Sequence, residues 1–136
     1  MSPDGLVVYV GDTNNHLIRE IVIATGAVTT LAGSGSASYA DGTGTAASFN
    51  RPRGVAVSPD GLVVYVTDAN NHRIRAIVVA TGAVTTLAGS GSAAYTDSTG
   101  TAASFYYPHG VAASPNGLVL YVADTDNNRI LSLIHI

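Results

Sequence analysis

Short apolar runs alternate with polar turns along the chain. In residues 54–88, four apolar runs follow one another; they cover residues 54–57, 62–67, 73–79 and 83–87. The polar segments between them are Ser58-Pro59-Asp60-Gly61, Asp68 to His72, and Thr81-Gly82. Pro, Asp and Gly in these combinations are typical of tight turns. The pattern therefore predicts four short strands in an antiparallel meander.

The second of these runs is apolar on both faces, and this determines the fold class. Leu62-Val63-Val64-Tyr65-Val66 lacks the alternation of a half-exposed strand, so its sheet needs a cover on each side. No helical pattern of useful length supplies that cover. Identical sheets packed face to face around an axis would supply it. We therefore predict an all-β chain made of β-propeller blades, each a four-stranded antiparallel meander.

The whole pattern returns with a period of 56 residues. Residues 2–57 and 58–113 are identical at 44 of 56 positions, and a third copy begins at Ser114. A period of this size indicates a solenoid, a propeller or an array of repeat units. The 136 residues hold about two and a half units. We therefore expect an incomplete propeller that continues into further blades of the same chain.

The repeat divides the chain into unequal parts. We expect residues 1–32 to be a partial blade without its inner strand, and residues 33–88 to be an interblade loop followed by a complete blade. Residues 89–130 are expected to be a second loop followed by a partial blade without its outer strand. Residues 131–136 are expected to be a non-native tail. Met1 takes the register position of Val57 and Ala113, so the natural unit is expected to begin upstream. Leu131 to Ile136 abandon the repeat and resemble the translation of a transposon-end sequencing adapter.

The long connections between the blades share their larger residues. These are Tyr39 and Tyr95, Phe49 and Phe105, and Pro52 and Pro108. We expect them to pin the loops between blades, with one short helical turn at residues 45–49. They are interpreted as packing residues and not as a ligand cage.

Composition narrows the range of partners. Charged residues make up 11% of the chain, against about 25% in an average soluble domain, and there is no Lys. The net charge of −3 gives no basic face, so we expect no nucleic-acid partner. No apolar run approaches the roughly 20 residues of a membrane span. The absence of Cys excludes a disulfide scaffold and a thiolate metal site, without fixing the compartment.

Three motifs resemble the NHL repeat. They are Phe49-Asn50-Arg51-Pro52-Arg53-Gly54-Val55-Ala56-Val57, Tyr65-Val66-Thr67-Asp68-Ala69-Asn70-Asn71-His72-Arg73-Ile74 and Thr86-Leu87-Ala88-Gly89. The resemblance covers residues 1–130, and the third copy departs from it where Asn128 replaces the His. It implies a propeller, usually six-bladed, with four strands per blade. It also implies a domain within a longer chain that binds other molecules.

Some polar residues invite a catalytic or metal-binding interpretation. His16 and His72 each follow an acidic residue in a turn, but the turn recurs in every unit, and we interpret it as an Asx-type turn. Asp124, Asp126 and Asn128 resemble the start of a calcium loop, yet the Gly and the bidentate acid that such a loop needs are missing. We expect no catalytic residue, no metal and no cofactor.

The differences between the copies point to a different candidate. The two full copies differ at 12 positions, and three of these differences fall in one short window. The residues concerned are Asn50, Arg51 and Arg53 in one copy and Tyr106, Tyr107 and His109 in the next. Tyr and Arg make good interface anchors, so we take these six residues as candidate ligand contacts. Neutral variation at exposed loop positions is the alternative explanation.

These observations favour a non-catalytic binding or scaffold module for a protein or glycan partner, within a larger protein. The alternative is part of a propeller enzyme of the metal-dependent lyase or lactonase type, with most catalytic residues outside this chain. That alternative requires ligands that differ between blades, whereas these blades are nearly identical and contain one Glu.

Overall fold

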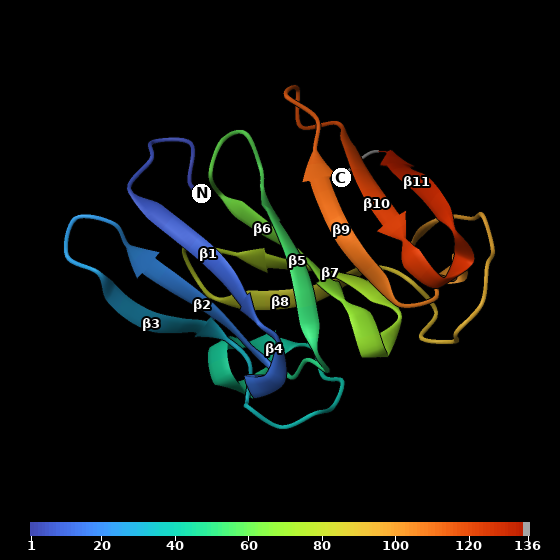
Figure 1. The fold of residues 1–136 in the computed structure, drawn as a ribbon, viewed down its shortest axis with the longest axis horizontal. Helices are drawn as coiled ribbons and strands as arrows, with labels where there is room; N and C mark the ends of the chain where they lie inside the picture. The colour runs from blue at the N-terminus through green and yellow to red at the C-terminus, as the bar shows by residue number, and fades with distance from the viewer. Residues whose placement is uncertain (135–136) are drawn as a thin grey trace.

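The computed structural model describes residues 1–134, which form three antiparallel sheets standing side by side (Figure 1). The first sheet contains β1 (Val7–Asp12), β2 (Leu17–Val22) and β3 (Ala27–Ala32). The second contains β5 (Pro52–Val57), β6 (Val63–Asp68), β7 (Arg73–Val78) and β8 (Ala83–Ala88). The third contains β9 (Pro108–Ala113), β10 (Val119–Asp124) and β11 (Arg129–Ile134). The all-β class and the antiparallel meander are confirmed.

The loops contain one short strand that was not predicted and a helical turn that lies slightly earlier than the predicted residues 45–49. The two-residue strand β4 (Gly42–Thr43) pairs with β8, so a piece of the preceding loop completes the second sheet. The expected helical turn is a 3-10 turn at Gly44–Ala46, and it recurs at Gly100–Ala102. Three further 3-10 turns join the second and third strands of each unit; they cover Thr13–Asn15, Ala69–Asn71 and Thr125–Asn127. Within residues 1–134 there is no helix of the length and apolar character that crossing a bilayer requires.

The Ser-Pro-Asp-Gly turns form as their sequence predicts. Asp60 Oδ1 accepts the Ser58 hydroxyl at 2.6 Å and the Leu62 N–H at 3.0 Å. Gly61 has a φ of +78°, a conformation that glycine adopts without steric cost. Each turn is therefore closed by its own side chain and backbone, which fixes the register of the hairpin that follows.

The core lies between the sheets, because alternate side chains of β6 are buried on opposite faces. Val64 and Val66 pack in one cluster with Phe49 and the first sheet. Tyr65, which points the other way, packs in a second cluster with Phe105 and the third sheet. The expected burial of this strand on both faces is confirmed, and each blade is held by its neighbours.

The loop aromatics divide into two kinds. Phe49 and Phe105 are 0% and 1% exposed, as expected of residues that pin the loops. Tyr39 and Tyr95 are 41% and 38% exposed, so the expectation that they are packed between blades is wrong for them. Each ring instead lies 3.7 Å below an arginine guanidinium, that of Arg73 and Arg129 respectively. The tyrosines hold their loops through cation–π contact at the surface.

Arg75 is the largest fully buried side chain of the protein, and it holds the loop to the blade. Its Nη1 donates to Asp68 Oδ2 at 2.7 Å and to the Ser48 carbonyl at 2.9 Å. Its Nη2 donates to the Ala40 carbonyl at 2.7 Å and to Asp41 Oδ1 at 2.8 Å. One guanidinium thus joins a strand to two points on the preceding loop.

Asp68, also fully buried, reaches the same loop from its other oxygen. Its Oδ1 accepts the Asn50 N–H at 2.8 Å, and its Oδ2 accepts the Asn71 amide at 2.8 Å. The expectation of an Asx-type turn, in which Asp68 bonds a backbone amide of its own turn, is therefore wrong, because the backbone donor is Asn50 in the loop and Asn71 donates through its side chain. Burial raises the pKa of the Asp68 carboxyl, against the opposing effect of Asn71, Asn50 and Arg75.

His16 and His72 connect one blade to the loop of the next. Both adopt left-handed backbone, with φ of 59° and 55°. The Nδ1 of His16 accepts the Arg51 N–H, and the Nδ1 of His72 accepts the Tyr107 N–H, each at 3.1 Å. Asn128 takes this place in the third unit with a φ of 55°, since Asn and His both tolerate left-handed backbone. Burial and then the nearby Arg73 lower the pKa of His72, while Asp124 and Asp126 act in the opposite direction.

The outer face of the third sheet is uncovered. Tyr121 is 47% exposed and Ile130 is 73% exposed. Their counterparts in the second sheet, Tyr65 and Ile74, are 6% and 0% exposed because the third sheet covers them. An apolar sheet face of this kind promotes association.

The first prediction concerns Arg75. Arg75→Met leaves Asp68 buried without its cation, so we expect the free energy of unfolding to fall by about 3 to 5 kcal/mol. Arg73→Met is the matched control, and loss of its surface contact with Tyr39 is expected to cost about 1 kcal/mol or less. Urea unfolding followed by circular dichroism measures both. Equal losses in the two variants would contradict the role of Arg75.

The second prediction concerns pH. Because the pKa of His72 is lowered in the folded state, the unfolded chain binds this proton more tightly. The contribution of His72 to stability is then complete above the ordinary pKa of about 6.5 and is lost as the pH falls through the lowered value. We expect His72→Asn, which copies Asn128, to reduce the loss of stability between neutral and mildly acidic pH. An unchanged pH dependence of the thermal midpoint would refute this.

The third prediction concerns association. We expect the chain to self-associate with increasing concentration, because the face around Tyr121 and Ile130 is apolar and exposed. Sedimentation velocity measures the effect. The double variant Tyr121→Ser, Ile130→Thr should shift the distribution toward the monomer. A wild-type chain that stays monomeric and melts cooperatively would show that the exposed face has no such effect.

Candidate functional site

The six candidate residues lie at one end of the strands, where the loops enter β5 and β9. These two strands run side by side near the centre of the molecule (Figure 1). The backbones approach closely, because the carbonyl oxygen of His109 occupies the space that a Cβ on Gly54 would need. Thr67 joins them, since its hydroxyl donates to that oxygen at 2.7 Å and accepts the Gly54 N–H at 2.8 Å. The ends of β5 and β9, together with the loops that enter them, form one continuous surface, which is called the rim below. These contacts hold its two halves together.

Two hydrogen bonds fix the backbone of the first window. The Asn50 N–H donates to the buried Asp68 at 2.8 Å, and the Arg51 N–H donates to His16 at 3.1 Å. Arg51 is held at a φ of 53°. Non-glycine residues adopt this left-handed region at some cost and keep it only where the surroundings impose it.

Equivalent hydrogen bonds fix the backbone of the second window, residues 106–109. These bonds and those of the first window are called the frame below. The Tyr106 N–H donates to the buried Asp124 at 2.7 Å, and the Tyr107 N–H donates to His72 at 3.1 Å. Tyr107 has a φ of 49°. The backbone geometry of the two windows is thus nearly identical, although the side chains at the same positions are entirely different.

The side chains of the windows form distinct groups along the rim. Tyr106 and Tyr107 stack with ring centroids 5.3 Å apart, and His72 meets Tyr107 edge-on at 4.7 Å. Arg53 and His109 lie near one another across the two strands. Burial lowers the pKa of His109, and the positive charge of Arg53 lowers it further.

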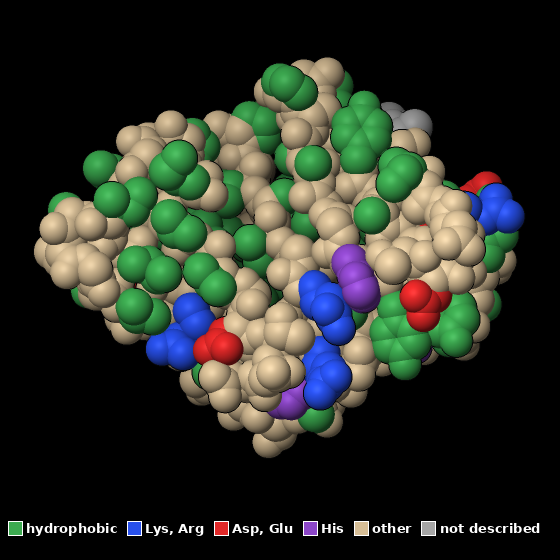
Figure 2. Space-filling model, viewed as in Figure 1, with side chains coloured by type: hydrophobic (Ala, Val, Ile, Leu, Met, Phe, Trp, Pro, Cys, Tyr) green, Lys and Arg blue, Asp and Glu red, His purple; other side chains and the backbone are tan. Residues whose placement is uncertain are grey.

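Both arginines and Tyr106 are exposed, whereas Asn50, Tyr107 and His109 are partly buried. Figure 2 shows basic, histidine, acidic and hydrophobic side chains gathered near the lower ends of β5 and β9. The structure thus brings Arg53 and His109 together. It places Arg51 beside His16 and the tyrosine pair beside His72, at equivalent positions of successive blades.

Sequence reasoning missed two participants in this surface. His72 was assigned to the scaffold, yet its ring also forms one side of the tyrosine cluster. Thr67 joins β5 to β9, and the sequence carried a signal for it, because Thr67 replaces Gly11 between the copies.

The side chains on this surface are of types that can bind a ligand. It offers aromatic faces for stacking and guanidinium groups for bidentate hydrogen bonds. Asp68 and Asp124 are buried and accept backbone N–H groups, so their carboxylates are engaged in the frame. Among the side chains of the described residues, no group of three or more His, Asp or Glu is placed to hold a metal ion.

Comparison with known proteins agrees with this architecture. The NHL repeat family model matches residues 49–77 and 105–131. The chain is 34% identical over 139 residues to Protein SUPPRESSOR OF QUENCHING 1, chloroplastic, of Arabidopsis thaliana. The matched region covers 96% of this chain and 13% of that protein. It is 34% identical over 130 residues to human NHL repeat-containing protein 2, which covers 90% of the chain and 18% of that protein. The chain thus spans less than a fifth of these curated relatives.

A solved structure shows the same arrangement of sheets. The crystal structure of an auxiliary nutrient binding protein from Bacteroides thetaiotaomicron superposes with a TM-score of 0.82 at 27% identity, over 97% of this chain and 35% of that one. The repeated meanders, the Asp and His contacts between blades and these matches lead to one conclusion: the chain belongs to the NHL-repeat family, and its sheets are blades of a β-propeller.

Proposed function

We propose that this stretch of propeller is a non-catalytic binding module, which presents the rim around Arg51, Arg53, Tyr106, Tyr107 and His109 to a protein or glycan ligand. The observation that carries the proposal is the constant frame of the two windows. Asn50 and Tyr106 donate to equivalent buried carboxylates at 2.8 and 2.7 Å, and the next residue has a φ near 50° in both. The side chains differ between the two windows, whereas the backbone conformation is the same.

The variable residues suit a polar ligand with some flat surface. The stacked tyrosines offer an aromatic face with hydroxyl groups at its edge, which suits a sugar ring or a peptide side chain. The exposed Arg51 and Arg53 add planar donors that pair with carboxylate or hydroxyl oxygens. Tyr and Arg dominate the binding energy of many interfaces.

The His and Asp side chains that could act in catalysis are already hydrogen-bonded to backbone N–H groups. The Nδ1 of His72 accepts a backbone N–H, and so do the carboxylates of Asp68 and Asp124. These contacts recur from blade to blade, whereas a catalytic constellation needs to occur once. The similarity to an auxiliary nutrient binding protein supports the use of this architecture for ligand binding.

The fourth prediction tests this surface in the full-length protein that contains the chain. The quadruple variant Arg51→Ala, Arg53→Ala, Tyr106→Ala, Tyr107→Ala is expected to lose about tenfold or more in affinity for the ligand, since such anchors contribute most of the binding energy. Binding is measured on a glycan array and on an array of immobilised proteins, and the array that responds identifies the ligand class.

The matched control lies at the other end of the strands. The triple variant Leu6→Ala, Leu62→Ala, Leu118→Ala removes side chains that are 60%, 60% and 57% exposed on the opposite rim. We expect it to bind as the wild type does. A ligand that binds the quadruple variant with unchanged affinity, or that is lost in the triple variant instead, would overturn the proposal.

A further inference from the structure

The Ser-Pro-Asp/Asn-Gly turns lie at the end of the strands opposite to the rim, and turns of neighbouring blades meet there. Residues 58–61 join β5 to β6, and residues 114–117 join β9 to β10. The Pro59 ring lies against Gly117, since a Cβ on that glycine would be 3.5 Å from Pro59 Cδ. Two complete hairpins thus face each other between the second and the third blade.

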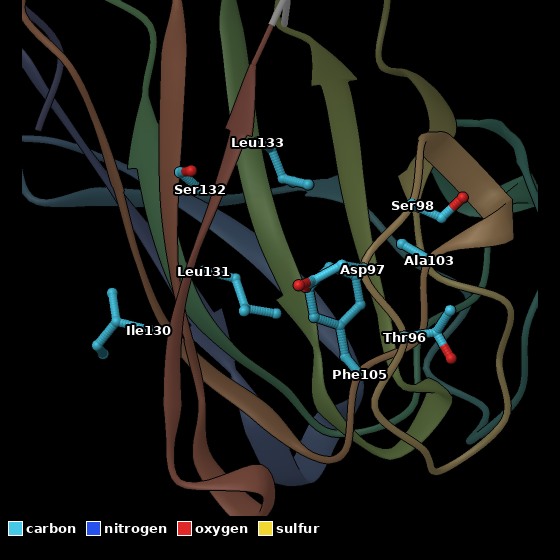
Figure 3. A pocket seen from close by; sticks show the side chains of 9 residues that line it. All are labelled: Thr96, Asp97, Ser98, Ala103, Phe105, Ile130, Leu131, Ser132 and Leu133. Carbon is cyan, nitrogen blue, oxygen red and sulfur yellow. The ribbon is translucent and has the colours of Figure 1, made fainter.

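A pocket of about 350 Å³ lies between these turns, and it is lined by Asp60, Tyr65 and Asn116 among others. This volume is near the lower end of the range of small-molecule sites, about 300 to 1,000 Å³. All the lining residues belong to the hairpins β5–β6 and β9–β10, of which both strands are present. The pocket beside β11 in Figure 3 differs in this respect, because the third sheet ends at β11 whereas the second continues from β7 to β8.

Tyr65 extends from the core to this pocket. The residue is 6% exposed and lines the pocket, and within residues 1–134 its hydroxyl has no hydrogen-bond partner. Burial raises the pKa of the hydroxyl, and the negative charge of Asp60 raises it further, so the group keeps its proton and can donate. Buried tyrosine hydroxyls usually have a partner. A ligand in the pocket would supply the one that this hydroxyl lacks.

Asp60 and Asn116 each have one polar group left for a ligand. Oδ1 of Asp60 is used within its own turn, as described above. Oδ1 of Asn116 likewise accepts the Ser114 hydroxyl at 2.7 Å and the Leu118 N–H at 3.1 Å. Asp60 Oδ2 and Asn116 Nδ2 have no partner among the residues that the structure describes. The pocket therefore combines a carboxylate acceptor from one blade with an amide donor from the next.

This combination distinguishes the pocket from its counterpart between the first and second blades. The equivalent residues there are Asp4, Tyr9 and Asp60, so two carboxylates face each other and both can only accept. Beside Tyr65, one group accepts and the other donates. A sugar hydroxyl also does both, so the pair of Asp60 and Asn116 matches adjacent hydroxyl groups on a sugar ring.

We propose that the pocket between the turns of the second and third blades is a binding site for one pyranose sugar residue, separate from the rim. Tyr65 donates to one hydroxyl group at the base of the pocket. Asp60 accepts from the ligand and Asn116 donates to it at the mouth, while Pro59 and Val63 provide apolar surface for the C–H groups of the ring.

The test uses the methyl glycosides of glucose, mannose and galactose as probes and saturation-transfer NMR as the measurement, a method that tolerates self-association of the chain. At least one probe is expected to bind saturably, with a dissociation constant on the order of 1 mM for so few atoms. Cyclohexanol, a six-membered ring with one hydroxyl group, should give a signal at least about fivefold weaker, because it cannot satisfy both Asp60 and Asn116. Saturable binding of none of the three sugars, or equal binding of cyclohexanol, would rule out the site.

A pair of matched variants locates the sugar. Tyr65→Phe removes the hydroxyl and keeps the ring in the core, so we expect the affinity to fall about fivefold. Its thermal midpoint should stay that of wild type, because the hydroxyl has no partner to lose. Tyr9→Phe makes the same change between the first and second blades and should leave the sugar signal unchanged. Equal affinities of wild type and Tyr65→Phe would show that the sugar does not occupy this pocket.

Two further variants test the donor and separate this site from the rim. Asn116→Asp copies Asp4 and Asp60, so its turn is expected to form, but it replaces the amide donor with a second carboxylate. We expect it to weaken sugar binding at least about fivefold. The quadruple variant of the rim should bind the sugar as wild type does. A signal that persists in Asn116→Asp and is lost in the rim variant would place the sugar at the rim and contradict this proposal.

Discussion

In the second and third blades, a buried carboxylate at the end of the second strand holds the preceding loop against the sheet: Asp68 in one and Asp124 in the other. Asp68 receives a backbone N–H from the preceding loop, an amide from its own turn and the guanidinium of Arg75. Arg75 in turn reaches two carbonyl groups of that loop. The loop, which Phe49 anchors in the core, is thereby also fixed against the blade by charge and hydrogen bonds. An ion pair this deeply buried is specific in geometry, because any other arrangement leaves charges without partners.

This arrangement also explains the candidate binding surface. The variable residues follow directly after the loop that Asp68 and Asp124 hold, and the histidine of the preceding blade holds the next N–H. Their backbone is therefore set by residues outside the variable positions. A change such as Arg51 to Tyr107 between the copies alters the surface and leaves φ at 53° and 49°. In this part of the blade, the side chains at the surface can therefore change while the backbone keeps its conformation.

Local patterns predicted most of the fold, and contacts distant in sequence account for what they missed. The four strands and the turn at Asp60 follow from apolar runs and turn residues that act over a few positions. The role of Asp68 does not, because its partner Asn50 lies 18 residues earlier in a loop. Strand β4 is too short for any pattern, and His72 needed the next blade to reveal its bond to Tyr107. The window at residues 50–53 was found because the two copies could be compared.

Native-state hydrogen exchange of four loop amides tests the frame most directly. If the buried carboxylates and the histidines fix the windows, the N–H groups of Asn50, Arg51, Tyr106 and Tyr107 exchange nearly as slowly as those in the centre of β6. Exchange at the rate of an open loop, with β6 still protected, would show that these backbones are not held and would contradict the account.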